Sequence, residues 1–152
     1  MTTQPKLIPE EQITLEFEVF GHPEPQGSTR AFIPKGWARP IITSTNKNLK
    51  SWRQELAGAA NKAVLDAPGN HFPIKKPRAV ALGVVFYFAP PQKCKDTWKA
   101  TRPDVDKLLR AIQDGLAGIV YDDDAQIASA YVQKIYGQPE RAAIEVRTIA
   151  GD

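Results

Sequence analysis

The spacing of apolar residues predicts strands in four parts of the chain. Residues 13–20 alternate Ile, Leu, Phe and Val with Thr and Glu, the period of a half-buried strand. Residues 78–89 are almost continuously apolar and rich in β-branched and aromatic side chains, which predicts a central strand that ends at a pair of prolines. Residues 128–136 and 142–148 predict two further strands, joined by a Gly-Gln-Pro-Glu turn.

Two segments have the period of a helix instead. The first begins after Asn46 or Asn48, either of which can cap it, and ends before a Pro-Gly pair. Its apolar face is Leu49, Trp52, Leu56, Ala60 and Val64. The second begins near Pro103, which suits a first helical turn because its missing N–H is not needed there. Its apolar stripe is Val105, Leu108, Leu109, Ile112 and Leu116, which leaves Asp106, Arg110, Gln113 and Asp114 on another side.

These elements predict a single small α/β (α+β) domain with a mixed sheet of four to five strands and two main helices. A chain of 152 residues can bury one sizeable core. We expect a flexible tail over residues 1–11 and the domain over 12–150. Residues 21–40 form a long loop punctuated by Pro and Gly, with a short strand or hairpin around Phe32 and residues 39–42.

Composition narrows the functional classes. The lone cysteine, Cys94, has no partner for an internal disulfide and no neighbours for a zinc site, which fits a reducing compartment. No run approaches the roughly 20 apolar residues that span a bilayer, so we expect a cytoplasmic protein with no membrane partner. The net charge of +3 is mild, but basic residues cluster in segments 21–53 and 93–102. Such clusters are either solvated loops or contacts to a polyanion.

Residues 101–127 contain two clusters of aspartates. Asp104 and Asp106 lie at the start of the second helix, where capping alone can explain them, and residues 122–124 are three consecutive aspartates, which alone can be an acidic surface turn. Together, these carboxylates in a chain with one Cys and two His indicate an oxygen-ligand site for a hard cation such as Mg²⁺ or Mn²⁺. Neither cluster follows the twelve-residue pattern of an EF-hand.

Residues 102–127 resemble the signature of the RusA-like Holliday junction resolvases. In that family a D-x-D-N-x-x-K helix start is followed by D-x-L and then by D-D-x-Q. The present chain has DVDKLLR at 104–110, DGL at 114–116 and DDAQ at 123–126. The likeness extends more weakly to Gly21 and Pro23 after the first strand and to the strand that ends before Pro90.

The resemblance implies a fold, an active site and a cofactor. It implies that Mg²⁺, with Mn²⁺ as a substitute, is held by Asp104, Asp106 and Asp124, with Asp123 close by. Arg110 stands where the family has a lysine near the scissile phosphate, and Lys107 stands where it has an asparagine. Arginine cannot act as an acid, so Arg110 can stabilise charge but not donate a proton, and Lys107 is either a substitute for the family lysine or a solvated charge.

The expected function is therefore that of a metal-dependent, structure-selective endodeoxyribonuclease. It would resolve four-way (Holliday) junctions by paired phosphodiester hydrolysis in DNA recombination and repair, as a homodimer, in a bacterial or phage-infected cell. The expected DNA contacts are Lys107, Arg102, Lys99, Lys95, Lys93, Arg30, Lys35 and Arg39. Trp37, Trp98 or Phe32 either stack on a splayed base or pack within the protein. The alternatives are a non-catalytic branched-DNA-binding protein on the same fold and a Ca²⁺- or partner-binding protein that does not touch DNA.

Overall fold

The computed structural model describes residues 11–27, 29–44 and 47–150, with backbone alone at 29–32 and 41–44. The expected tail, residues 1–11, lies outside the described residues except for Glu11, as does Asn46, one of the two expected caps of the first helix. Within the described residues the elements are β1 (Thr14–Phe20), β2 (Thr29–Phe32), β3 (Ile41–Ser44), α1 (Leu49–Asp66), β4 (Val80–Phe88), α2 (Val105–Leu116), the 3₁₀ turn η1 (Asp124–Gln126), β5 (Ile127–Tyr136) and β6 (Arg141–Thr148).

In this part of the chain, four strands form one mixed sheet in the order β1-β6-β4-β5. The β1/β6 and β6/β4 pairs are antiparallel and β4/β5 is parallel. β4 is central, as expected. β5 and β6 follow each other in sequence with residues 137–140 between them, but they are not neighbours, because β4 lies between them. The α+β fold expected from the sequence is confirmed.

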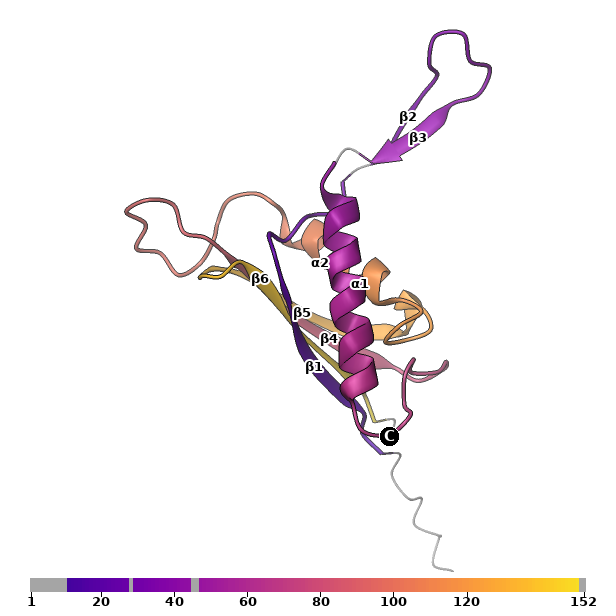
Figure 1. The fold of residues 1–152 in the computed structure, drawn as a ribbon, viewed down its shortest axis with the longest axis vertical. Coiled ribbons are helices and arrows are strands. Elements are labelled where there is room, and N and C mark those ends of the chain that lie inside the picture. The colour runs from indigo at the N-terminus through magenta and orange to yellow at the C-terminus, as the bar shows by residue number, and fades with distance from the viewer. Residues whose placement is uncertain (1–10, 28, 45–46, 151–152) are drawn as a thin grey trace, which may run out of the picture.

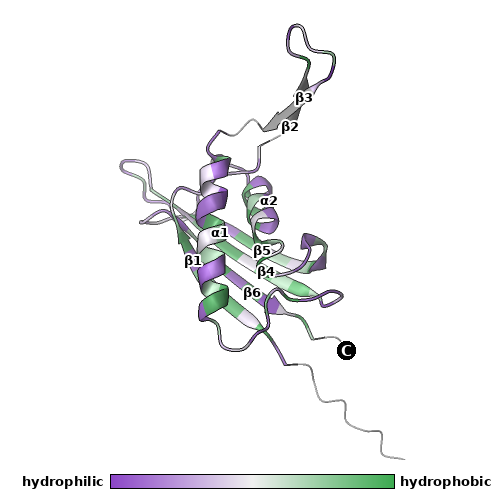
Figure 2. Ribbon diagram, turned by 45° about the vertical axis from the view of Figure 1, so that its right-hand side comes forward, coloured by the Kyte–Doolittle hydropathy of each residue, from purple (hydrophilic) through white to green (hydrophobic). Residues whose placement is uncertain are grey.

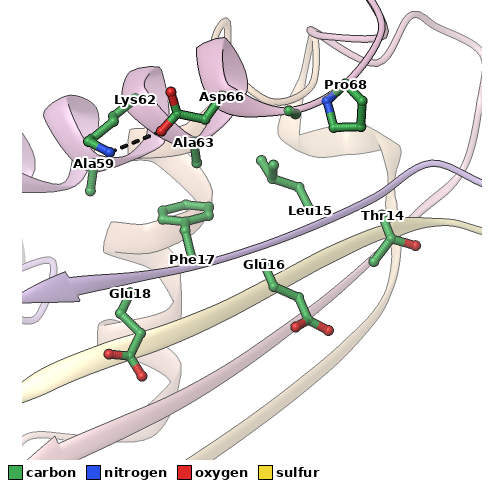
Figure 3. A pocket seen from close by; sticks show the side chains of 11 residues that line it. Thr14, Leu15, Glu16, Phe17, Glu18, Ala59, Lys62, Ala63, Asp66 and Pro68 are labelled. Carbon is green, nitrogen blue, oxygen red and sulfur yellow. Dashed lines mark hydrogen bonds and ion pairs between the residues drawn. The ribbon is translucent and has the colours of Figure 1, made fainter.

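Both helices cover the same face of the sheet (Figures 1 and 2). The alternation of β1 follows from this one-sided cover: Leu15 and Phe17 point toward α1, whereas Glu16 and Glu18 point away (Figure 3). A groove of about 460 Å³ lies between α1 and β1, and its lining residues come from β1, from the second half of α1 and from the turn after it. This groove gathers apolar and exposed charged side chains and contains none of the expected site residues.

The expected apolar stripe of α2 is buried at three of its five positions, and Leu109 is half-buried. Leu108, Ile112 and Leu116 are fully buried, whereas Val105 is 38% exposed. Val105 is the first residue of the helix and precedes the turn that packs on the core. Where α1 and α2 meet, a Cβ added at Gly115 would lie 2.4 Å from Leu56 Cδ2, so glycine permits the close approach of the two helices.

The hairpin expected near Phe32 and residues 39–42 is formed by β2 and β3, which pair in antiparallel register. This hairpin extends away from the sheet, beyond the first turn of α1 (Figure 1). Among the described residues, no helix combines the length and the apolar character needed to cross a membrane.

Candidate active site

The start of α2 carries the first acidic pair. Asp104 is the N-cap residue with extended backbone angles, φ −71° and ψ 141°, and Asp106 lies in the first turn. Both side chains are exposed. Within the described residues Asp104 makes no side-chain capping hydrogen bond. Asp104 therefore occupies the N-cap position, but its carboxylate is not used to cap the helix. Pro103 precedes the N-cap, so the expectation that it lies in the first turn is wrong; the chain there is tied to β5 instead.

Lys134 makes that connection from the helix-facing side of β5. Its Nζ donates to the carbonyl oxygen of Thr101 at 2.6 Å and to that of Pro103 at 2.7 Å. Burial and the nearby charge of Lys99 lower the pKa of Lys134, and the carboxylate of Asp104 opposes that shift. The two carbonyls belong to the three residues before Asp104, so β5 helps to fix where the first acidic pair lies.

Gln126 organises the second acidic cluster. Asp123 and Gln126 form a capping box around η1, in which Asp123 Oδ1 accepts from the Ala125 N–H at 3.0 Å and Gln126 Oε1 accepts from the Asp123 N–H at 2.9 Å. The amide of Gln126 donates to the carbonyl oxygens of Ile74 and Arg78 at 3.1 and 3.0 Å. The D-D-x-Q sequence is thus a turn that a buried glutamine anchors to the chain before β4.

Two lysines that the sequence did not single out face this turn. Lys75 Nζ lies 3.5 Å from Asp122 Oδ1, and Lys76 Nζ lies 3.1 Å from Asp123 Oδ2. The Lys76 backbone N–H also donates to Asp122 at 3.1 Å. The pKa of Asp123 is lowered mainly by the hydrogen bond from the Ala125 N–H and, to a smaller extent, by Lys76. Asp122 and Asp123 therefore each have a lysine partner.

Asp124 has different surroundings. The pKa of Asp124 is raised, first by hydrogen bonding with Asp123 and then by burial. Hydrogen bonding with Asp114 and repulsion from its charge raise the pKa of Asp124 further. Among the described residues, Asp124 forms no ion pair with a basic side chain. Beneath it, burial followed by the charges of Asp124 and Asp114 raises the pKa of Tyr121, whose hydroxyl donates to the Gln113 carbonyl at 2.6 Å.

Asp114 is thus closer to the second cluster than the sequence suggested. It lies on the same side of α2 as Asp106 and Arg110, a four-residue spacing that was the available signal. Arg53 of α1 donates to Asp114 Oδ2 at 3.3 Å and to Gln26 Oε1 at 2.5 Å. No sequence signal connects Arg53 with Asp114, because they lie on different helices.

The structure brings together Asp114, Asp123 and Asp124, and it places Asp104 and Asp106 at the other end of α2. The eight residues from Asp106 to Asp114 correspond to about 12 Å of helix. Of the acidic, histidine and cysteine side chains that the structure describes, no three are arranged to hold a metal ion. The all-carboxylate donor set suits a hard cation. The arrangement described here does not enclose one.

The expected basic contacts lie on three elements. On α2, Lys107 and Arg110 are exposed, and Lys35 and Arg39 are exposed between β2 and β3; Arg30 is on β2, where the backbone alone is described. On the connection from β4 to α2, the exposed ones are Lys93, Lys95 and Arg102. Lys99 differs because its ammonium lies over the Phe88 and Tyr136 rings, 5.2 and 5.5 Å from their centroids, and donates to Thr101 Oγ1 at 2.9 Å. Packing as well as charge therefore explains Lys99.

Comparison with known proteins places this arrangement in a class of nucleases. The profile of the endodeoxyribonuclease RusA family matches residues 22–147, which include both acidic clusters. The chain belongs to the endodeoxyribonuclease RusA family. It is 34% identical over 70 residues to the crossover junction endodeoxyribonuclease rusA of Lactococcus phage r1t, covering 45% of this chain and 53% of the phage protein. It is 23% identical over 149 residues to the uncharacterized protein YqaN of Bacillus subtilis strain 168, covering 90% and 97% of the two chains.

Proposed function

We propose that this protein is a metal-dependent endodeoxyribonuclease that resolves Holliday junctions during DNA recombination or repair. The observation that carries the proposal is the family match over residues 22–147, which spans the D-x-D start of α2 and the D-D-x-Q turn at η1. The packing of α2 against both β5 and η1 supports it, because one helix connects the two acidic clusters.

In the proposed site, Asp104, Asp106 and Asp124 hold Mg²⁺, for which Mn²⁺ can substitute, and Asp123 lies beside them. The ion would lower the pKa of the attacking water and neutralise charge on the phosphate. The lack of a capping bond at Asp104 and of a basic partner for Asp124, within the described residues, supports assigning these two to a cation rather than to the fold. Closing the site requires Asp104 and Asp106 to approach Asp124.

The other residues act on the DNA. Arg110 and Lys107 stand exposed on the same helix as the carboxylates, where their charges can contact phosphate oxygens near the scissile bond. Lys93, Lys95 and Arg102 would contact the backbone farther away. Such contacts position the DNA without reading its sequence, which suits an enzyme that recognises branched structure.

Incubation with a labelled four-way junction and a linear duplex, in Mg²⁺ or EDTA, tests the proposal. Wild-type protein should cut the junction in Mg²⁺ and leave the duplex intact. Asp106→Asn and Asp124→Asn should each lower the cleavage rate more than about 100-fold, since even outer-shell partners of metal ligands are worth about 10–100-fold. Asp66→Asn is the matched control, because Asp66 is an exposed acid at the far end of α1. Junction binding without cleavage by the wild type would favour the alternative, a non-catalytic branched-DNA-binding protein.

Paired cleavage of a two-fold symmetric junction calls for two active sites, and we propose a homodimer. The sheet face opposite the helices is the candidate interface, because it carries a groove of about 470 Å³ to which Val85, Tyr131 and Ala143 contribute. The residues that line this groove come from all four strands of the sheet, β1, β6, β4 and β5. A monomeric mass for the active enzyme bound to its junction would contradict the dimer.

A further inference from the structure

The β2–β3 arm, residues 29–44, is unusual in its pairing. In the described part of the chain β2 and β3 form a two-stranded sheet of their own, separate from the four-stranded one. The arm projects from the body beyond the start of α1 (Figures 1 and 2). An isolated two-stranded hairpin is only marginally stable in water. Its ordered form would therefore be stabilised by a partner that lies along it.

The chemistry of the arm indicates which partner. Its sequence contains Arg30, Lys35 and Arg39 and no acidic residue. At its tip Ile33 is 63% exposed and Trp37 is 60% exposed, and a turn closed by the Trp37 N–H and the Pro34 carbonyl at 3.0 Å presents them. A purely cationic ribbon with an apolar tip fits a polyanion that also offers flat apolar surfaces. Nucleic acid has both properties.

The root of the arm is connected to the acidic site. The Gln26 N–H donates to the Lys107 carbonyl on α2 at 2.9 Å, and Arg53 bridges the Gln26 side chain to Asp114. The arm therefore starts beside the helix that carries the proposed catalytic carboxylates. The six residues from Thr29 to Pro34 span at most about 20 Å. That reach exceeds the roughly 12 Å width of a major groove, which accepts a two-stranded β-ribbon.

We infer that the β2–β3 arm lies along a DNA groove next to the cleavage site and that Trp37 stacks on a base at the branch point. This inference rests on the proposed function and extends it by naming what recognises the branch. In the open form of a four-way junction, in which the arms do not stack on one another, the base pairs at the centre lack a stacking neighbour on one side. An apolar side chain can stack on this free base-pair face, whereas in continuous duplex it can do so only after two neighbouring base pairs unstack. Of the exposed aromatic residues considered from the sequence, Trp37 is the one at the tip of the arm.

Binding measurements in EDTA test the inference apart from catalysis. The substrates are a four-way junction and a linear duplex, each with 2-aminopurine either at the branch point or at the matching position of the duplex. Trp37→Ala should weaken junction binding about tenfold or more, since a stacked base contributes that much, and should change duplex binding less than about twofold. It should also abolish the fluorescence change at the branch point. Trp37→Phe should restore most of both.

The matched control is Leu65→Ala, which removes another exposed apolar side chain, at the far end of α1. It should bind the junction like the wild type. Equal weakening on junction and duplex, no weakening at all, or a change from dimer to monomer in Trp37→Ala would each overturn the inference, the last because the arm would then hold a second copy of the chain. If the wild type shows the branch-point signal but never cuts, the arm inference stands and the nuclease function falls. If the wild type cuts junctions and Trp37→Ala binds them normally, only the arm inference falls.

Discussion

Replacing Lys134 with methionine should loosen the start of α2 while leaving the rest of the fold in place. Methionine keeps the length of the stem but removes the donor to the Thr101 and Pro103 carbonyls. A hydrogen bond from a charged donor contributes about 1.5–3 kcal/mol. Thr101 is exposed, so water can replace that partner, whereas Pro103 is half-buried. We therefore expect a net loss of about 2 kcal/mol in the free energy of unfolding, equivalent to roughly 4–8 °C in Tm for a domain of this size.

Urea denaturation and amide hydrogen exchange measure this effect globally and locally. The most informative amide is that of Leu108, which donates to the Asp104 carbonyl at 3.1 Å and should exchange faster in Lys134→Met. In the proposed function, the Mg²⁺ concentration that supports half-maximal cleavage should also rise. Lys62→Met is the matched control, because Lys62 pairs with Asp66 on the exposed face of α1 and should cost less than about 0.5 kcal/mol. If the two variants are equally stable, the reasoning about Lys134 is refuted.

Two further predictions concern stability. Gly115→Ala should destabilise the protein by about 1–3 kcal/mol in thermal denaturation, because the added Cβ would lie 2.4 Å from the buried Leu56 side chain. Gly58→Ala, with no described atom within 4 Å of the added Cβ, should stabilise α1 by up to about 1 kcal/mol. Equal effects of the two substitutions would contradict the close helix contact. Burial raises the pKa of Glu140, but hydrogen bonds from the Ala89 N–H and His22 outweigh burial and leave the pKa lowered. The stability lost in Glu140→Gln should therefore be full above pH 4.5 and vanish as the pH falls through the lower folded-state pKa. A stability difference that is independent of pH from 3 to 7 would refute this.

The sequence predicted the elements of the fold but not the order of its strands. The alternation in residues 13–20 is a local property of the chain, and it identified β1 because one face of that strand meets α1. Strand pairing depends on contacts between distant residues. The Gly-Gln-Pro-Glu turn after β5 therefore indicated two strands but not that β4 lies between them. Pro103 was misplaced for a similar reason, because Lys134, which holds this segment outside the helix, is more than 30 residues away.

For the candidate site, the sequence indicated acidic candidates but not the residues that surround them. The likeness of the motif to a known family singled out Asp104, Asp106 and Asp124, and their role in a site stays a prediction. The sequence did not indicate the basic residues that contact the acidic side chains. Arg53 lies on a helix and Lys75 and Lys76 lie in the segment before β4, and neither segment has a pattern that distinguishes these residues from solvated charges. Lys134 was the one with a local signal. In β5 it occupies the same face as Val132, whose β4 partner Val84 is fully buried, so a lysine there breaks the apolar alternation.

The supporting lysine and arginine side chains also explain how several carboxylates can lie close together in the fold. Each described cation faces a different part of the cluster: Lys75 and Lys76 face Asp122 and Asp123, and Arg53 faces Asp114. Close carboxylates repel one another unless positive charge lies among them, so these pairs offset the repulsion that folding would otherwise have to overcome. Asp124 lies in the middle of this group without a basic partner among the described residues. The described ion pairs thus surround Asp124 but do not include it, and in the proposed function Mg²⁺ would supply the positive charge at this position.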